Sequence, residues 1–294
     1  MVANDSAVKM PVVVSGRRSG IRLVSRLRVT EIIPIALFFG VIALGFVGPL
    51  LLSRDPNDVQ PLLRLREPSG HHFFGTDTLG RDVFTRTVYG LRTSLSIALV
   101  ATTLSAFVGV MVGLICGTLG GRIDAFGQRV VDVVMAFPFL LLMIVIVSML
   151  GPSPRNVVIG ISFVMWTSLS RIVRSVAVSV RSRPFIEAAS AIGCSTPRII
   201  MRHIWPQTLG PVLVVTTANF ASVIVAEASL SFLGMGVPPP SPSLGAMINE
   251  GRAYLETLPS LVIGPGIVLS LTVITLNLLG DVVRDRLDPT LRGR

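Results

Sequence analysis

The sequence predicts an all-α membrane protein with six transmembrane helices and with both termini in the cytoplasm. The chain of 294 residues is 51% hydrophobic and only 14% charged, with a mean hydropathy of +0.73, which is far from the composition of soluble globular domains. A helix of about 20 apolar residues crosses the roughly 30 Å hydrocarbon core of a bilayer. Apolar runs of that length begin near six positions, Ile32, Leu95, Val130, Val157, Leu209 and Leu261.

The first 30 residues are predicted to form a cytoplasmic tail. They hold six basic residues and lack the compact apolar core and small-residue cleavage site of a secretory signal peptide. The first apolar run, 31–53, is therefore expected to remain in the protein as a transmembrane helix.

The distribution of basic residues sets the orientation. With the N-terminus inside, eighteen Lys and Arg residues lie in the cytoplasm and eight outside. Six of those eight fall in one long segment, 54–93, whose charge counts less toward orientation. This places an extracytoplasmic segment at 54–93 and a five-helix core at 94–290. Within that core, we expect a cytoplasmic loop at 180–207 and an extracytoplasmic loop at 230–260.

The second run carries a small residue at every fourth position. Such a stripe lies on one side of a helix and lets a second backbone approach closely, as ordinary packing inside a bundle requires. Prolines in or next to other runs, at positions 34, 138, 211 and 265, can kink a helix. The stripe comprises Ala101, Ser105, Gly109, Gly113, Gly117 and Gly121.

Several classes of function lack the residues that they require. Lys9 is the only lysine, and no glycine-rich loop ending in Lys and Ser or Thr could cradle a nucleotide. His71 and His72 are predicted outside and His203 inside, so they cannot share a metal site. No catalytic triad can be drawn, and the scattered arginines form no nucleic-acid-binding face. We therefore predict neither an enzyme nor a nucleic-acid-binding protein.

Two acids within the apolar runs need an explanation because charge in a bilayer is costly. Asp132 lies three residues after Arg129, which favours an interfacial ion pair between them. Glu227 either accepts structural hydrogen bonds or lines the route of a substrate. We treat Asn219 and Glu227, both in the fifth run, as candidate residues of a translocation pathway.

Residues 187–206 form a polar, arginine-bearing stretch between long apolar runs. Pro184 suits a first helical turn, and Gly193 suits the left-handed residue that ends a helix. Ser195 or Thr196 can cap a second helix, which Pro206 would halt before the fifth run. This helix, turn and helix would either dock a partner protein in the cytoplasm or lie on lipid headgroups.

The same stretch resembles the EAA loop of ABC importer permeases, and the resemblance favours docking. The matching residues are Glu187, Ala188 and Ala189, then Gly193, and after nine residues His203, Ile204, Trp205 and Pro206. In that family, the loop forms a coupling helix seated in a cleft of the ATP-binding subunit. The resemblance thus assigns coupling to Glu187, Ala188, Ala189, Gly193, His203 and Pro206. Trp205 stands where the family usually has leucine.

Other segments resemble the C-type permease subunit of dipeptide and oligopeptide importers. They are FGTDTLGRDVFTRTVYGLRTSL at 74–95, the stretch from EASLSFLG at 227, and NLLGDVVRDRLDP at 277–289. The likeness covers roughly residues 30–290 and implies the type I ABC importer permease fold in the inner membrane of a bacterium. Nickel, glutathione and some oligosaccharide importers are similar to this branch, so these substrates remain alternatives.

The resemblance also implies a set of partners. A homologous second permease, two ATP-binding subunits and an extracytoplasmic substrate-binding protein would complete the importer, with residues 228–260 facing the binding protein. ATP and Mg would bind to the partner subunits, and this chain would bind no cofactor. The alternative is a stand-alone transporter driven by an ion gradient, with Asp132 and Glu227 as its ion sites.

Overall fold

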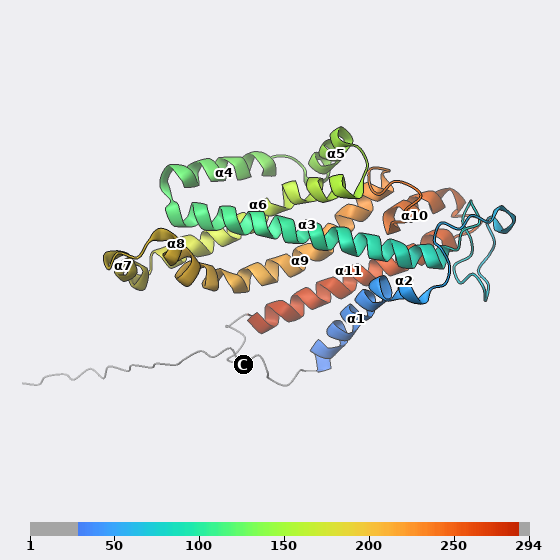
Figure 1. Cartoon of the computed structure of the whole chain (residues 1–294), viewed down its shortest axis with the longest axis horizontal. Helices are drawn as coiled ribbons and strands as arrows, with labels where there is room; N and C mark the ends of the chain where they lie inside the picture. Colours follow the sequence, from blue (N-terminus) through green and yellow to red (C-terminus); the bar gives the residue numbers. More distant parts are fainter. Residues whose placement is uncertain (1–28, 288–294) are drawn as a thin grey trace, which may run out of the picture.

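The chain folds into an elongated bundle of helices in a computed structural model that describes residues 29–287. Figure 1 shows long helices running roughly along the longest axis of the molecule. The helices are α1 (Val29–Phe46), α2 (Gly48–Leu51), η1 (Pro61–Leu63), α3 (Val83–Leu119), α4 (Gly121–Met135), α5 (Phe139–Leu150), α6 (Pro154–Arg181), α7 (Pro184–Ala191), α8 (Thr196–Ile199), a π-helical turn η2 (Ile200–Ile204), α9 (Trp205–Phe232), α10 (Leu244–Gly251), η3 (Arg252–Tyr254) and α11 (Ser260–Leu287).

Four helical segments in the described part of the chain are long and apolar enough to cross a membrane. They are α3, α6, the run from α8 through α9, and α11. The pair α4 and α5 counts as a fifth if it forms one broken span, and the apolar part of α1, Glu31–Phe46, is shorter than a usual span. The predicted all-α membrane architecture is confirmed at this level.

The third apolar run differs from its prediction as one helix that starts at Val130. Residues Val130–Met135 complete α4, and the chain then turns by 88° before α5 begins at Phe139. Pro138 stands directly before α5. Its ring disfavours helical backbone at the preceding residue, which explains why the run breaks at this point.

The small-residue stripe of α3 packs against the backbone of α6. A Cβ atom on Gly109 would lie 2.7 Å from the carbonyl oxygen of Trp166, and one on Gly113 would lie 2.6 Å from that of Ser170. The stripe ends at Gly117, since Gly121 lies beyond α3 and has open space around it. The predicted close approach of a second helix is confirmed, and the second helix is α6.

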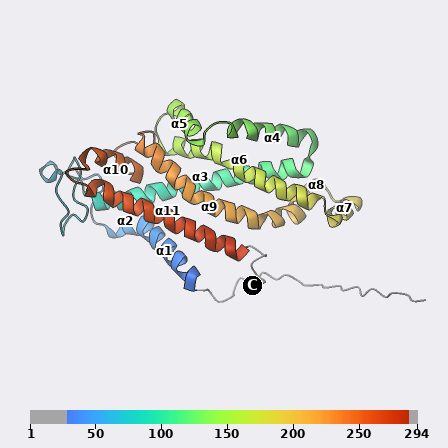
Figure 2. The ribbon, with the colours of Figure 1, turned by 180° about the vertical axis from the view of Figure 1, so that it is seen from behind.

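The predicted coupling stretch (187–206) and the predicted outer segment (54–93) lie at opposite ends of the bundle. Figures 1 and 2 show α7 and α8 at one end, and the loops that follow α2, together with α10, at the other. Within the described residues, the start of α1 and the end of α11 meet, because Arg286 Nε donates to Glu31 Oε1 at 3.0 Å. The predicted tail 1–30 lies outside the described residues, except for its last two.

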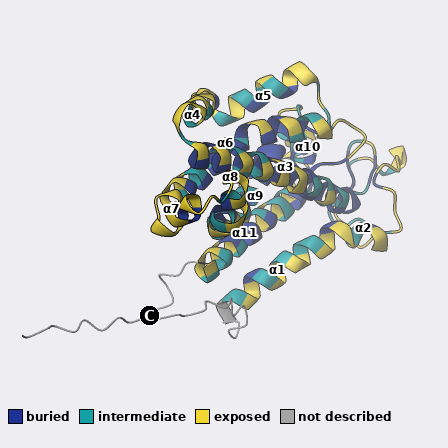
Figure 3. Ribbon diagram, turned by 60° about the vertical axis from the view of Figure 1, so that its left-hand side comes forward, coloured by how far each residue is buried: buried dark blue, intermediate teal, exposed yellow. Residues whose placement is uncertain are grey.

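Burial is greatest where the long helices face one another. Figure 3 shows buried residues concentrated on α3, α6 and α9, whereas α1, α4 and α5 carry much exposed surface. Among the exposed apolar side chains are Phe39 of α1, Phe126 of α4 and Leu141 of α5. Apolar surface on this scale is expected of helices that face lipid or another membrane subunit.

Candidate functional site

Helix α7 ends in the way that the sequence predicts, at a left-handed glycine. Gly193 has φ of +85°, and its N–H donates to Ser190 O while Cys194 N–H donates to Ala189 O, both at 3.0 Å. These two bonds form a Schellman motif, which satisfies carbonyl groups left over at a helix end. The φ of Gly193 disfavours any residue with a Cβ, although a Cβ there would meet nothing within 4 Å.

The second half of the stretch differs from its prediction. Pro206 does not halt a helix, because α8, the π-helical turn η2 and α9 follow one another without interruption as far as Phe232. The N–H of Trp205 bonds to Ile200 O across the wide π turn. Pro206 follows immediately in the first turn of α9, where its missing N–H and its fixed φ are tolerated.

The residues assigned to coupling share one end of the molecule, and most of them are exposed. Glu187, Ala188, Gly193 and Pro206 are exposed, His203 is partly exposed, and Ala189 packs inward. Among the described residues, the Glu187 side chain makes no hydrogen bond or ion pair. Apolar side chains are exposed beside them, with Ile192 83%, Met201 65% and Phe185 42% accessible.

Buried side chains attach the stretch from α7 to η2 to the long helix α6. Ile186 of α7, Ile199 of α8 and Ile204 of η2 are buried in one cluster with Val173 and Ala177 of α6. On the surface, Arg183 Nη1 donates to Gln207 Oε1 at 3.1 Å, which joins the start of α7 to the start of α9. The exposed surface is thus the outer side of an element that is packed firmly against α6.

Glu227 is enclosed between α3 and α9. Its side chain is fully buried, and Ser231 Oγ donates to Glu227 Oε1 at 2.7 Å. The hydroxyl of Ser94 on α3 lies beside the same carboxyl group. In the described residues, neither Ser94 Oγ nor Glu227 Oε2 has a hydrogen-bond partner. In this conformation, the hydrogen bond of the Glu227 side chain lies within α9, and its carboxyl group is buried beside α3.

The neighbouring face of α9 borders two adjoining cavities. One of about 350 Å³ lies against α5 and α11, and one of about 390 Å³ lies against α10 and α11. Val225 and Ser229 line both cavities, which are otherwise walled mainly by apolar side chains. Asn219, the other candidate pathway residue, is partly exposed on the same helix.

The two acidic residues of α4 pair with arginines of α6. Asp132 pairs with Arg171, so the predicted partner Arg129 was wrong: the pair joins two helices instead of two residues of one turn. Sequence reasoning missed a second pair, in which Arg174 Nε and Nη2 donate to the two carboxylate oxygens of Asp124, each at 2.5 Å. Arg174 lies in the predicted fourth span, where an unpaired charge is costly. This cost indicates that Arg174 needs an acidic partner.

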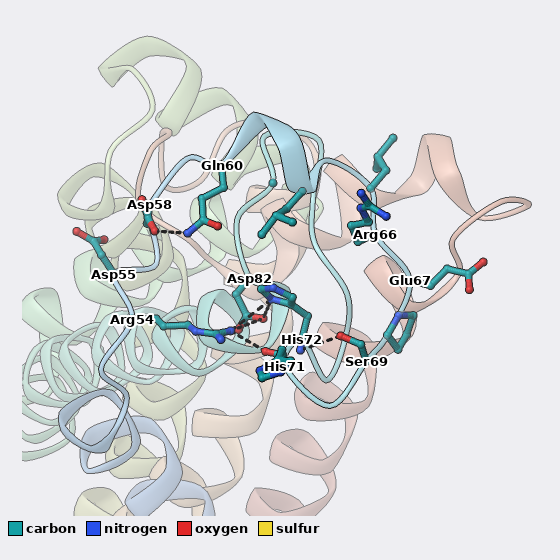
Figure 4. A pocket seen from close by; sticks show the side chains of 14 residues that line it. Arg54, Asp55, Asp58, Gln60, Arg66, Glu67, Ser69, His71, His72 and Asp82 are labelled. Carbon is teal, nitrogen blue, oxygen red and sulfur yellow. Dashed lines mark hydrogen bonds and ion pairs between the residues drawn. The ribbon is translucent and has the colours of Figure 1, made fainter.

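A polar cavity of about 910 Å³ lies in the outer segment and was also missed. Figure 4 shows Arg54, His72 and Asp82 meeting on one wall, with Asp58 and Gln60 above them and Arg66 and Glu67 across the cavity. His72 Nδ1 lies 2.9 Å from Asp82 Oδ1. Asp82 Oδ2 also accepts from the N–H of Thr85 at 2.8 Å and thereby caps α3.

Because α3 begins at Val83, the predicted outer segment 54–93 includes the first turns of this helix. Buried ion pairs attach the predicted outer segment to the start of α3. Arg81 Nε lies 2.7 Å and Arg86 Nε 3.5 Å from Asp77 Oδ2. Arg86 Nη1 also donates to Pro56 O at 3.1 Å. Buried charges persist when they are paired in this way, so the outer segment is held as a defined structure on top of α3.

Comparison with known proteins places the chain among transport proteins. Residues 109–293 match the model of the family described as binding-protein-dependent transport system inner membrane component. The dipeptide transport system permease protein DppC of Alkalihalophilus pseudofirmus is 40% identical over 94% of this chain and 88% of its own length. The glutathione transport system permease protein GsiD of Escherichia coli is also 40% identical, over 77% of this chain and 75% of its own length.

Solved structures agree on the fold. An amino acid ABC transporter chain has a TM-score of 0.53 at 16% identity, covering 68% of this chain and 94% of its own. A chain of the MetNI methionine ABC transporter, in an inward-facing conformation, has a TM-score of 0.53 at 15% identity, covering 68% of this chain and 96% of its own. By its sequence relatives and its helical architecture, this chain belongs to the family of inner membrane permease components of binding-protein-dependent transport systems.

Proposed function

We propose that this chain is the transmembrane permease subunit of an ATP-driven importer that carries dipeptides or short oligopeptides across the cytoplasmic membrane of a bacterium. The observation that carries the proposal is the 40% identity to a dipeptide permease over 94% of the chain. The equal identity to a glutathione permease keeps that peptide-like substrate as an alternative within the same subunit type. Nickel and oligosaccharides are further alternatives for this type of subunit.

The proposed topology has six spans with both termini in the cytoplasm. The ion pair between Glu31 and Arg286 supports termini on the same side, since it joins the start of α1 to the end of α11. Helix α2 follows α1 after one residue and extends the short first span. The broken pair α4 and α5 would serve as the third span. The loops at opposite ends of the bundle then face the cytoplasm (180–207) and the exterior (54–93 and 230–260).

The proposed coupling surface is the exposed side of the stretch from α7 to the start of α9. Glu187, Ala188 and Gly193 present small or polar groups there, and Ile192 adds an apolar contact of the kind that a protein partner buries. An ATP-binding subunit would receive this surface in a cleft. His203 and Pro206 would set the orientation of the stretch, while Ala189 packs it inward.

The proposed complex contains a homologous second permease, two ATP-binding subunits that hold ATP and Mg, and an extracytoplasmic binding protein. The family description, which names dependence on a binding protein, supports the last of these. Residues 228–260 and the outer segment would face that protein. Closure of the ATP-binding subunits would pull the coupling surface inward and rock the bundle from an inward-facing to an outward-facing state, which receives the substrate.

The proposed pathway runs along α9. Its cavity-lining face, with Val225 and Ser229, carries no charged side chain, and Asn219 lies on the same helix. Glu227 would support this wall from behind through Ser231. A pathway without fixed charges suits an importer whose selectivity rests on its binding protein.

Reconstituted uptake tests the proposal. The importer, purified with the subunits that accompany the tagged chain, is placed in proteoliposomes with its binding protein and a radiolabelled dialanine. We expect uptake that requires ATP. Uptake of glutathione or nickel in place of dialanine would correct the substrate, and uptake driven by a proton or sodium gradient without ATP would refute the importer.

A further inference from the structure

Helix α4 is attached to α6 by two ion pairs in the half of the bundle that leads to α7. Arg174 binds Asp124 through two nitrogen atoms, and Arg171 binds Asp132 one turn away. The side chains of Arg174 and Asp124 are only 32% and 18% exposed. A paired arginine with two parallel bonds fixes both distance and orientation, which a single apolar contact does not.

Helix α6 connects directly to the coupling surface. Arg174 lies about two turns before the end of α6 at Arg181, and α7 begins at Pro184. The same turns of α6 are backed by α3, because a Cβ on Gly117 would lie 2.8 Å from Arg174 O. Val173 and Ala177 pack there against the buried residues of α7 and α8. This packing would carry a displacement of α7 to the turns of α6 that hold Arg171 and Arg174.

We propose that Arg174 and Asp124, assisted by Arg171 and Asp132, are positioning residues that make α4 move as one body with α6 and α7. This inference rests on the proposed function and adds the route by which the coupling surface controls a second wall of the bundle. Helix α4 buries only Val131 and Val134, whereas Ile123, Phe126 and Val133 are exposed, so the two ion pairs add directional contacts to a small apolar one. Through these ion pairs, closure of the ATP-binding subunits would move α4 together with α6.

Exchanging the charges of Asp124 and Arg174 tests whether their ion pair couples α4 to α6. In the reconstituted importer, we measure dialanine uptake per ATP hydrolysed for Asp124→Arg, for Arg174→Asp and for the double exchange. Each single variant sets two like charges against each other and should lower this ratio about tenfold, within the range of coupling between sites. The double exchange should recover most of it. The matched control is Arg155→Asp, which reverses an exposed charge at the other end of α6 and should leave the ratio unchanged.

A cross-link provides a second test, in which the measurement of ATP hydrolysis does not depend on the substrate. With Cys116 and Cys194 replaced by alanine, cysteines at positions 124 and 174 are joined by a short bifunctional thiol reagent in the assembled importer. The two cysteines remove the ion pair and should lower uptake per ATP; if α4 and α6 move as one body, cross-linking should restore this ratio while ATP hydrolysis continues. Loss of ATP hydrolysis, with each single-cysteine variant unaffected by the reagent, would overturn the proposal.

Unchanged uptake per ATP in both single charge variants would also overturn it. If the single and exchanged variants fail to assemble, the cross-linking experiment alone tests the proposal. If the wild-type importer hydrolyses ATP but takes up no dialanine, the peptide substrate of the proposed function is refuted. The response of ATP hydrolysis to the cross-link still tests whether α4 moves together with α6.

Discussion

Gly193 is required by its backbone conformation. A Cβ at position 193 would meet open space within this chain, but the φ of Gly193 is +85°. The cost of a substitution therefore arises in the backbone of this chain, and any clash would be with a partner that covers the turn.

Replacing Gly193 by alanine should weaken the end of α7 by about 1 kcal/mol, the usual cost of left-handed backbone for a residue with a Cβ. Gly210→Ala is the matched control, because a Cβ there also meets nothing within 4 Å and its φ is helical. We expect Gly193→Ala, and more strongly Gly193→Trp, to lower uptake per ATP while the protein still inserts. Equal behaviour of Gly193→Ala and Gly210→Ala would show that the turn conformation is unimportant.

Glu227 combines complete burial with a single hydrogen bond from Ser231. Glu227→Gln keeps the oxygen that accepts this bond and should retain uptake and thermal stability. Glu227→Leu leaves the buried Ser231 hydroxyl without its acceptor and should destabilise the protein by about 1–3 kcal/mol. Thermal unfolding in detergent measures both variants. A folded Glu227→Gln protein without ATP-driven uptake would show instead that transport needs the carboxyl group.

At the scale of helices, the close contact between α3 and α6 predicts that a side chain added at Gly113 destabilises the protein. A Cβ on Gly113 would lie 2.6 Å from Ser170 O and 2.7 Å from Val173 Cβ, so Gly113→Ala forces the two helices apart. We expect a loss of about 1–3 kcal/mol, seen as a lower midpoint of thermal unfolding. Gly40→Ala is the control, because α1 has open space at that position. A stable Gly113→Ala protein would contradict the close packing of these helices.

The sequence predicted those elements whose signals are local. The stripe of small residues in α3 and the glycine that ends α7 each depend on neighbours within a few turns, and both predictions are confirmed. The pair of Arg174 and Asp124 joins residues fifty positions apart, and the partner of Asp132 lies on another helix. Hydropathy and spacing along one helix carry no information about such contacts. The continuation of the helix through Pro206 was also missed, because the π turn before it has no signature in composition.

The outer segment shows the same limit. The apolar runs on either side of it and the distribution of basic residues indicated a segment outside the membrane, but its cavity forms only when distant parts of the segment meet. A Cβ on Gly80, which has φ of +76°, would lie 1.9 Å from Gln60 O. Both residues line the cavity, and this contact between positions twenty residues apart can be found only in three dimensions.

At the scale of the whole molecule, an ATP-driven importer and a stand-alone transporter driven by an ion gradient differ in their source of energy. In cells, uptake through an ATP-driven importer should continue for as long as ATP lasts after an uncoupler collapses the proton gradient. A stand-alone transporter with Asp132 and Glu227 as ion sites would stop at once. Measuring uptake and cellular ATP together distinguishes direct loss of the gradient from slow depletion of ATP.

The central claim is that this chain works by docking an ATP-binding subunit through the exposed surface between α7 and α9. The most direct test is gentle purification of the tagged chain from its native membrane, followed by measurement of the ATP hydrolysis that accompanies it. We predict co-purified ATP hydrolysis that is lost when Glu187 and Gly193 are changed together and is kept in Gly210→Ala. A chain that purifies without any ATP-hydrolysing partner in several mild detergents would contradict the claim.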